Sequence, residues 1–331
     1  MNKIAVVILN WNGAKLLPQF LPSVIEFSQN ATLYVADNAS TDESVEILKR
    51  DFPMVKIIQN TSNFGFAKGY NEALSFVDEP YFALVNSDVE VTPNWLQPVE
   101  ELFDKEPNVA IIQPKILNYK NKTHFEYAGA AGGFIDKYGF PFCRGRIFET
   151  LEEDKGQFDD EIEIFWATGA CLFIRKKVFQ ELKGFDVDFF AHQEEIDLCW
   201  RSFNLGYQTK YTSKSIIYHV GGATLDVSNP IKTYLNFRNS LYMLVKNLPF
   251  KKLLPIIFLR MVLDGIAAFK FLFQGKLFHF IAVGNAHFSF YGNLIKCYRK
   301  RNKIQKPNYF KTKSIVYLYF IKSKNYFTLI F

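Results

Sequence analysis

The sequence predicts an α/β fold with a mostly parallel central sheet flanked by helices. Three observations support this prediction. Continuous apolar runs recur along the first 90 or so residues, amphipathic stretches separate them, and the connections between the two are short. Parallel strands are buried on both faces and need a crossover helix between them, so this alternation is typical of a parallel sheet.

The first strand is expected at residues 3–9 (KIAVVIL), a β-branched run that polar residues end at once. This run is too short for a secretory signal, so we interpret it as part of the fold. The next expected elements are a helix at 16–27, a strand at 31–40, a helix at 42–50, a strand at 55–60, a helix at 66–76 and a strand at 81–88.

The pattern weakens from residue 93 to 160. Within this region, the Gly- and aromatic-rich stretch at 128–142 (AGAAGGFIDKYGFPF) predicts loops and short strands. A strand leading into a helix is then expected within 162–179. An acidic stretch at 192–207 (HQEEIDLCWRSFNLGY) and a strand that ends at His219 follow it.

Charge is distributed unevenly along the chain, although the net charge is only +6. From Lys246 onward there are 16 Lys and Arg against one acid, Asp264, whereas the preceding residues carry 23 basic and 32 acidic side chains. An acidic body with a basic tail argues against a nucleic-acid-coating protein and favours a tail that meets an anionic surface. The four scattered cysteines predict neither a disulfide framework nor a thiolate zinc site.

Residues 252–273 are strongly apolar but contain four charges, which makes a membrane-spanning helix unfavourable. On a helix those charges fall within a sector of about 120°. We therefore expect a helix lying at a membrane interface with its basic side chains on the polar face. A helical hairpin packed on the body of the protein, or a dimer interface, are the alternatives. The charged residues are Lys252, Arg260, Asp264 and Lys270.

Polar clusters follow four of the expected strands or begin the helix after them. In parallel sheets, ligands bind at the carboxyl ends of the strands, so these clusters predict one binding edge. Turn formation alone also favours Asn, Asp and Gly at such positions. The clusters are Asn10-Trp11-Asn12, Asp37-Asn38, Asn63-Phe64-Gly65 and Asn86-Ser87-Asp88.

Two acidic features are candidates for chemistry. Asp88 ends a strand, and Glu194-Glu195-Ile196-Asp197 begins an expected helix. Glu194 and Asp197 would face one side of that helix while Glu195 points elsewhere. A favourable interaction with the helix dipole would also explain acids in a first turn. His219, at a strand end beside two glycines, is well placed to reach a site.

Seven segments, in this order, strongly resemble the family 2 glycosyltransferases, particularly the rhamnosyltransferase-like members that build bacterial surface polysaccharides. The resemblance covers roughly residues 3–245 and implies a GT-A fold. The segments are VVILNWNG, VADNASTDES, NFGFAKGYN, LVNSDVEV, WATGACLFIRKKVF, GFDVDFFAHQEEIDLCWR and YHVGGAT.

The resemblance implies an inverting transfer of a sugar, with rhamnose as one option, from a nucleoside-diphosphate donor. The acceptor would be a lipid-linked or growing surface polysaccharide at the cytoplasmic face of the plasma membrane, where the protein would lie peripherally. It implies a nucleotide-sugar-binding half at residues 1–115, an acceptor and catalytic half at 116–230, and a basic helical region at 231–331 that associates with the membrane.

Donor-binding residues carry over position by position. Asp37 matches an acid that contacts the nucleobase, and Asn10 and Asn12 would line the nucleotide pocket. Asn63 and Gly65 match a loop near the nucleotide-sugar, and Asn71 lies on the helix that supports it. The turn beneath the donor sugar matches Thr168 and Gly169.

Metal-binding and catalytic residues also carry over. Asn86-Ser87-Asp88 matches a metal-binding Asp-x-Asp motif whose first acid is Asn here, so Asp88 would be the main ligand. His219 matches a histidine that completes metal binding in some relatives. Glu195 matches the catalytic base, which is usually Asp. Mg²⁺ or Mn²⁺ would neutralise the leaving diphosphate, and one base suffices for inversion.

Two other functions remain open from the residues alone. A nucleotidyltransferase also uses a nucleotide-binding sheet and acidic metal ligands, but it usually has a Gly-rich basic phosphate loop where this chain has Asn10-Trp11-Asn12-Gly13. A catalytically silent scaffold of a polysaccharide assembly complex is compatible with the departures at Asn86 and Glu195. The donor, the linkage and the oligomeric state are not determined by the sequence.

Overall fold

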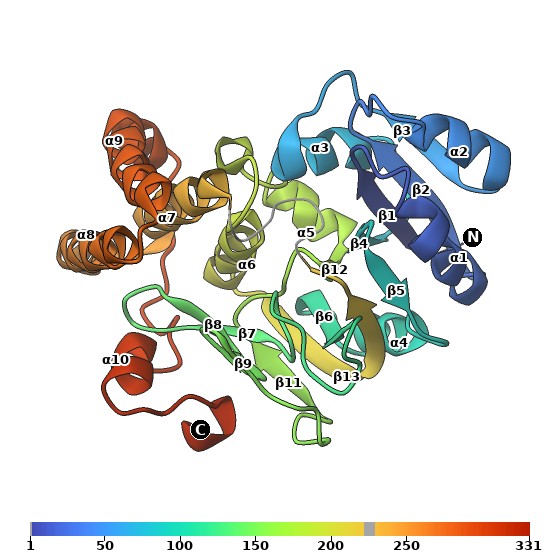
Figure 1. Ribbon diagram of the computed structural model, residues 1–331. Helices are drawn as coiled ribbons and strands as arrows, with labels where there is room; N and C mark the ends of the chain where they lie inside the picture. Colours follow the sequence, from blue (N-terminus) through green and yellow to red (C-terminus); the bar gives the residue numbers. More distant parts are fainter. Residues whose placement is uncertain (1, 222–228) are drawn as a thin grey trace.

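The predicted α/β fold is confirmed in the computed structural model, which describes residues 2–221 and 229–331 (Figure 1). A large mixed sheet forms its centre. The strands along this sheet are β11 (Glu161–Ile164), β13 (Gln208–His219), β6 (Val109–Asn118), β12 (Cys171–Arg175), β4 (Tyr81–Asn86), β1 (Ile4–Asn10), β2 (Ala31–Asp37) and β3 (Lys56–Gln59), with β5 (Val89–Val91) paired to β13.

Helices cover both faces of the sheet. The apolar side chains of α1, α2 and α4 share one buried cluster with Ile4, Val6 and Ile8, and those of α3, α5 and α6 share another with Ala5 and Val7. Alternate side chains of β1 thus enter opposite cores, which explains why its sequence is apolar throughout. The helices are α1 (Leu17–Phe27), α2 (Ser44–Asp51), α3 (Gly65–Leu74), α4 (Gln97–Lys105), α5 (Lys176–Glu181) and α6 (Glu194–Leu205).

Most strands of the sheet run in one direction. β1 pairs in parallel with both β2 and β4, β2 with β3, and β13 with β6. The strands β12, β11 and β5 run the opposite way. The carboxyl ends of β1, β2, β4 and β13 consequently lie on one edge, where the polar clusters of the sequence are gathered.

The first third of the weakly patterned region from residue 93 to 160 contains two regular elements that the sequence did not predict. Helix α4 and the ten-residue strand β6 lie there. Gln113, Pro114 and Lys115 interrupt the apolar pattern of β6, yet Gln113 and Lys115 are both buried. Lys115 bridges Asp154 and Asp159, so tertiary ion pairs offset a charge that obscures the strand in the sequence.

A smaller four-stranded sheet follows, as the short-strand prediction required. Its strands are β7 (Gly133–Ile135), β8 (Pro141–Cys143), β9 (Arg146–Ile147) and β10 (Thr150–Leu151). The end of the chain packs beside it through α10 (Ile315–Phe320) and a 3₁₀ turn at Phe327–Leu329. Glu152 accepts a hydrogen bond from the Phe327 amide at 2.7 Å.

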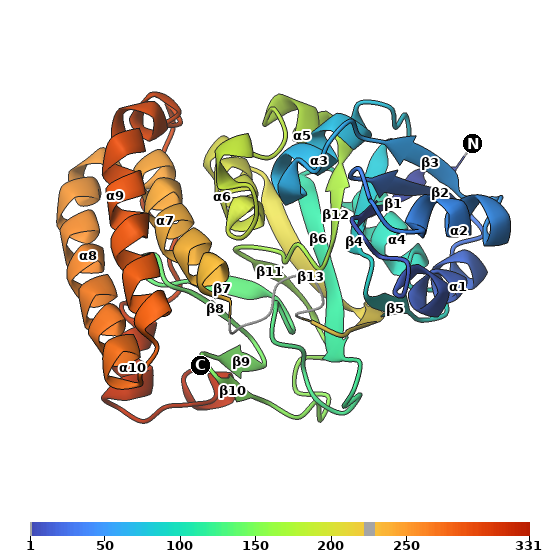
Figure 2. The same cartoon turned by 45° about the horizontal axis from the view of Figure 1, so that its top comes forward.

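Three long helices stand together on one side of the molecule, away from β1–β3 (Figure 2). They are α7 (Pro230–Asn247), α8 (Phe250–Phe273) and α9 (Leu277–Arg299). Among the described residues, no helix combines the length and hydrophobicity that a membrane crossing needs.

The charged sector expected for residues 252–273 packs against the body of the protein at its two central members. Arg260 and Asp264 are only 4% and 3% exposed. Arg260 donates to the Gly139 carbonyl at 3.0 Å and to Ser240 Oγ at 2.6 Å, and Asp264 lies 3.3 Å from His287. The charges face the protein because partners lie there, and the apolar side of α8 faces solvent instead.

Candidate active site

Strand register brings the four polar clusters together, as predicted. Asn10 pairs with Asp37 across β1 and β2, and Asn86 lies beside Leu9 across β1 and β4. A backbone hydrogen bond extends the pairing of β1 and β2 by one residue: the Asn38 N–H donates to the Asn10 carbonyl at 2.8 Å. The edge is therefore a continuous polar surface rather than a set of separate turns.

The residues predicted to bind the nucleotide lie at the ends of β1 and β2 and in the loops that follow them. The Asn10 amide donates to Asp37 Oδ1 at 3.1 Å, and Asp37 Oδ2 accepts from the Ser40 amide at 3.0 Å. Asn12 adopts a left-handed φ of 53° and accepts from the Thr41 amide at 2.8 Å. Asn10 Oδ1 is buried without a partner in the described chain, so an acceptor remains available beside Asp37.

Asn38 organises the loop after β3, a role that the sequence analysis did not give it. Its amide donates to Asn63 Oδ1 at 3.0 Å and to the Gly65 carbonyl at 3.1 Å, while its oxygen accepts from Asn60. Gly65 has φ +71°, and a side chain there would meet the Phe190 ring at 2.6 Å. Gly65 therefore lies directly against Phe190, and the predicted nucleotide-sugar loop packs on the segment before α6.

The other predicted donor-binding residues contact segments that are distant in the sequence. The Asn71 amide group donates to the Phe185 carbonyl at 2.8 Å and accepts from the Phe185 amide at 2.9 Å. Thr168 is buried, and its amide donates to Gln113 Oε1 at 3.0 Å. Gly169 lies against the Phe66 ring. Asn71 thus fixes the segment that leads to α6, and Gln113, another residue without a predicted role, fixes the turn beneath the expected donor sugar.

Asp88 and His219 lie side by side, as the metal prediction requires. His219 Nε2 is 3.1 Å from Asp88 Oδ1, and both side chains are almost fully buried. Asn86 Nδ2 lies 3.4 Å from the same ring nitrogen. On the far side of the ring, Nδ1 is 3.3 Å from Oε1 of the buried Glu126. Glu126 lies just before the Gly-rich stretch at 128–142 and had no predicted role.

The donor chemistry of this cluster fits a divalent cation. Burial lowers the pKa of His219, but Asp88 and Glu126 outweigh it and raise the pKa to about 10. The proton on the His219 ring thus offsets the negative charge of the buried Asp88 and Glu126 carboxylates. A metal ion could supply that positive charge in place of the proton. No set of three or more His, Cys, Asp or Glu side chains in the described chain is arranged to hold a metal without further ligands.

Glu194 and Glu195 begin α6 after a strained segment. Phe190, His192 and Gln193 all have φ between 63° and 71°, a region that non-glycine residues rarely adopt. Burial and the neighbouring Glu195 raise the pKa of Glu194 well above its usual value, and burial raises the pKa of Glu195 to about 7. Each glutamate has one buried oxygen without a partner in the described chain, which favours a site where substrate supplies hydrogen bonds.

Asp197 has a different environment from the two glutamates. Its Oδ2 accepts from Arg201 at 2.8 Å and Lys246 at 2.7 Å, and its Oδ1 accepts from Asn247 at 2.8 Å. Burial raises the pKa of Asp197, but Lys246 and Arg201 bring it below its usual value. These contacts favour a structural role for Asp197 over the catalytic role that the sequence analysis considered.

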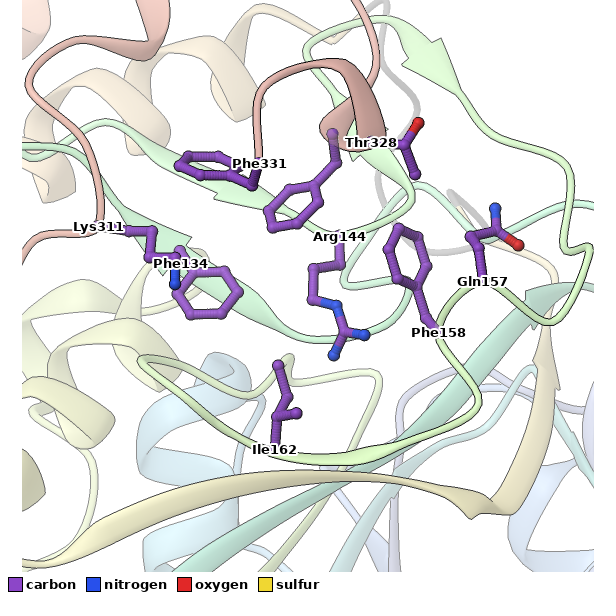
Figure 3. Close-up of a pocket in the computed structure, with 9 residues that line it drawn as sticks. Phe134, Arg144, Gln157, Phe158, Ile162, Lys311, Thr328 and Phe331 are labelled. Carbon is purple, nitrogen blue, oxygen red and sulfur yellow. The ribbon is translucent and has the colours of Figure 1, made fainter.

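A pocket of about 330 Å³ lies elsewhere, between the small sheet and the end of the chain (Figure 3). Four phenylalanines are among the nine residues that line it, and Arg144 and Lys311 add positive charge. Arg144 is held by Asp160 through two hydrogen bonds of 2.8 and 2.9 Å. None of the predicted site residues lines this pocket, so it is separate from the polar edge of the main sheet.

The model of the family described as Glycosyl transferase family 2 matches residues 5–183. The chain belongs to this family. The matched region contains every predicted donor-binding residue and Asp88. This assignment favours the glycosyltransferase over the nucleotidyltransferase alternative.

Two relatives extend the comparison of this family 2 glycosyltransferase. N-acetylglucosaminyl-diphospho-decaprenol L-rhamnosyltransferase from Mycobacterium tuberculosis is 22% identical over 241 residues, which is 67% of this chain and 77% of that protein. Low-salt glycan biosynthesis hexosyltransferase Agl10 from Haloferax volcanii is 22% identical over 294 residues, which is 84% of this chain and 87% of that protein.

Solved structures confirm the GT-A fold of this glycosyltransferase. GalNAc-T7 with UDP, GalNAc and Mn²⁺ matches with a TM-score of 0.58 at 16% identity, over 76% of this chain and 49% of that one, so this chain spans about half of its length. The mannosyltransferase PcManGT from Pyrobaculum calidifontis, with GDP-Man and Mn²⁺, matches with a TM-score of 0.52 at 12% identity, over 88% of this chain and 75% of that one.

Proposed function

We propose that this glycosyltransferase is a metal-dependent, inverting hexosyltransferase. It would move a sugar, with L-rhamnose as the first candidate, from a nucleoside-diphosphate donor to a lipid-linked or growing polysaccharide acceptor. The single observation that carries the proposal is the buried Asp88–His219 pair, 3.1 Å apart, at the edge of the sheet that also holds Asn10 and Asp37. The rhamnosyltransferase relative supports the choice of sugar and acceptor.

In the proposed reaction, Asp37 and Asn10 bind the nucleotide, and Asp88 and His219 would hold Mg²⁺ or Mn²⁺. The bound ion would neutralise charge on the leaving diphosphate. Glu195 accepts the proton of the acceptor hydroxyl as that oxygen forms a bond to the anomeric carbon and the bond to the diphosphate breaks. A carboxylate with a pKa near 7 is suited to this task at neutral pH.

Asp88→Asn is expected to weaken Mn²⁺ binding by at least about tenfold, because it removes the main acidic ligand while keeping the size of the side chain. Isothermal titration with Mn²⁺, alone and with a nucleoside diphosphate, measures this effect. Asp78→Asn is the matched control, since Asp78 is fully exposed and pairs only with Lys176 in the described chain. Equal Mn²⁺ affinity in all three proteins would contradict the metal assignment.

Membrane association is proposed on the exposed apolar face of α8 and α9. Phe258, Phe273 and Phe288 are 73%, 86% and 79% exposed, and a surface of this kind is unusual for a monomer in water. The basic side chains of the C-terminal region lie around the ends of these helices, including Lys251, Lys270, Lys276, Arg299 and Lys303. An apolar face with a basic surround complements an anionic bilayer at the inner face of the plasma membrane.

The full-length variant Phe258→Glu/Phe273→Glu/Phe288→Glu is expected to lose sedimentation with vesicles of phosphatidylglycerol and phosphatidylcholine. Phe76→Glu, which changes a 71% exposed ring on the donor-binding side, is expected to sediment like the wild type. Truncation at residue 246 would be a poor test of membrane binding. It would also delete Lys246 and Asn247, which hydrogen-bond to the buried Asp197. Vesicle binding by the triple variant would contradict the membrane proposal. The proposal would also be contradicted if the wild type forms a dimer and binds no vesicles, and the triple variant is a monomer.

A further inference from the structure

The backbone between η1 (Val187–Phe189) and α6 is held in an unfavourable conformation. Phe190, His192 and Gln193 have φ of 63°, 69° and 71°. Non-glycine residues rarely adopt such angles, so neighbouring structure must hold the segment in place. The segment leads directly into Glu194 and Glu195, and its shape therefore sets where those carboxylates lie.

Asn239, in the middle of α7, holds this segment from one side. Its side chain is fully buried. Its Nδ2 lies 2.9 Å from the carbonyl oxygens of Phe189 and Ala191 and 2.8 Å from that of His192. One amide group thus gathers three carbonyls from four consecutive residues, which an extended or helical backbone could not present to it.

Arg238 fixes the direction of that amide. Its Nε donates to Asn239 Oδ1 at 2.9 Å, so the nitrogen of Asn239 is the atom that faces the carbonyls. The Arg238 guanidinium also donates to the Asp188 and Phe189 carbonyls, at 3.0 and 3.2 Å. The two neighbouring residues of α7 therefore supply only donors to a segment that exposes only acceptors.

Helix α3 holds the same segment from the other side. The Phe190 carbonyl accepts from the amides of Phe66 and Ala67, at 2.8 and 3.2 Å. These are amides of the first turn of α3, which have no partner within their own helix. The strained segment is thus bonded both to the predicted nucleotide-sugar loop and to the C-terminal helices.

We infer that Asn239 is a positioning residue that holds residues 189–193 in the one conformation that presents Glu195 to the acceptor. The inference rests on the proposed function, in which Glu195 is the base. It assigns α7 to the catalytic machinery, although the resemblance-based division places this helix in the membrane-associating region. Asn239 itself acts through the backbone and touches no reacting atom.

Asn239→Asp tests this inference because it keeps the size of the side chain and replaces the amide nitrogen with an oxygen that faces three carbonyl oxygens. Misplacement of a catalytic group by about 1 Å can cost about 10²-fold in rate, so kcat is expected to fall by about that factor. The KM of the donor is expected to change less than about threefold, since the Asp37 pocket is untouched. Hydrogen exchange of the amides in 188–197 is expected to accelerate.

Asn236→Asp is the matched control. It makes the same substitution one turn earlier on α7, where the Asn236 amide donates to the Lys232 carbonyl of its own helix at 2.9 Å. This variant is expected to keep wild-type kcat and wild-type exchange in 188–197. If Asn239→Asp does not fold, Asn239→Ala is measured in the same way.

Three outcomes would overturn the inference. One is unchanged kcat and exchange in the Asn239 variants. Another is a parallel loss of kcat, donor affinity and melting temperature, which would indicate a general structural role. The third is an equal effect of Asn236→Asp. Should the wild type transfer no sugar from any donor, the proposed function fails, while the exchange contrast between the variants at positions 239 and 236 still tests whether Asn239 holds the segment.

Discussion

Glu195→Gln is expected to lower kcat for sugar transfer by about 10²–10⁴-fold, the usual contribution of a general base. The amide keeps the size of the side chain but cannot accept the acceptor proton. Donor affinity is expected to stay near the wild-type value, because in the described chain no hydrogen bond or ion pair joins the Glu195 side chain to the predicted nucleotide-binding residues. Steady-state kinetics with a series of nucleotide sugars, together with thermal shift by the donor, measure the two effects separately.

The pH profile supplies an independent check on the same residue. Because burial raises the pKa of Glu195 to about 7, the base is protonated below that pH and wild-type activity should fall as pH decreases through it. The residual activity of Glu195→Gln should lack this step. Glu195→Asp, which restores the residue usual in the family, should keep the step and more activity than the amide variant.

Glu194→Gln is the matched control, since Glu194 is adjacent and its pKa is also raised by burial. A smaller loss of activity is expected from it than from Glu195→Gln. If Glu194→Gln instead removes activity and Glu195→Gln does not, the base is Glu194. If both variants transfer sugar like the wild type under saturating Mn²⁺, neither glutamate is the base. If the wild type and both variants all fail to transfer sugar from any donor, the enzyme assignment of this chain fails and the silent-scaffold alternative stands.

Lys246→Met is expected to destabilise the protein by about 3–5 kcal/mol, the usual cost of removing one partner from a buried ion pair. Lys246 is almost fully buried and lies 2.7 Å from both Asp186 and Asp197. Without Lys246, the carboxylates of Asp186 and Asp197 would lose a buried positive charge that stabilises them. Urea unfolding at neutral pH measures the change in free energy.

Lys296→Met is the control for this effect. Its side chain is 57% exposed and lies 2.7 Å from Asp188, so a cost below about 1 kcal/mol is expected. Similar losses for the two lysine variants would contradict the buried-network interpretation.

Acidification should reduce the difference between wild type and Lys246→Met. Burial raises the pKa of Asp186, but Lys246 and Lys300 hold it well below the usual value. A carboxyl group with a lowered folded-state pKa stabilises the protein above its unfolded pKa, near 4, and this stabilisation is lost as the pH falls below that value. The wild type should therefore lose more stability than the variant between about pH 5 and pH 3.

The strands and helices of the donor-binding half could be read from sequence because their order repeats one simple pattern. Apolar runs such as KIAVVIL must be buried on both faces, and only a helix-covered parallel sheet provides that environment for several runs in succession. The polar edge follows from the same pattern, since the carboxyl ends of parallel strands meet on one side.

Strand β6 could not be recognised in this way. Gln113, Pro114 and Lys115 break its apolar run, and what allows them in the interior lies far along the chain. Gln113 donates to the Gly129 carbonyl at 3.1 Å and accepts from the Thr168 amide, and Lys115 pairs with Asp154. Burial of polar groups by distant partners has no local sequence pattern.

The orientation of α8 on the protein also could not be predicted from the sequence. Its charged sector is evident in the sequence, but a helical wheel does not say which sector faces the protein. Arg260 is drawn inward by the Gly139 carbonyl and by Ser240, and these acceptors come from a loop and a different helix. The sequence determined that the helix is two-sided, and the fold determined which side faces solvent.

By itself, the sequence determined the α/β architecture, the polar edge of the sheet, the family resemblance and the acidic residues Asp88, Glu194 and Glu195, because these depend on short-range patterns and on motif order. Only the tertiary structure decided that Asp197 is paired with cations, whereas Glu194 and Glu195 each have one oxygen without a partner in the described chain. Only it placed Glu126 behind His219 and Asn239 behind the strained segment before α6. Such assignments depend on contacts between residues tens to hundreds of positions apart, and a linear pattern carries no record of them.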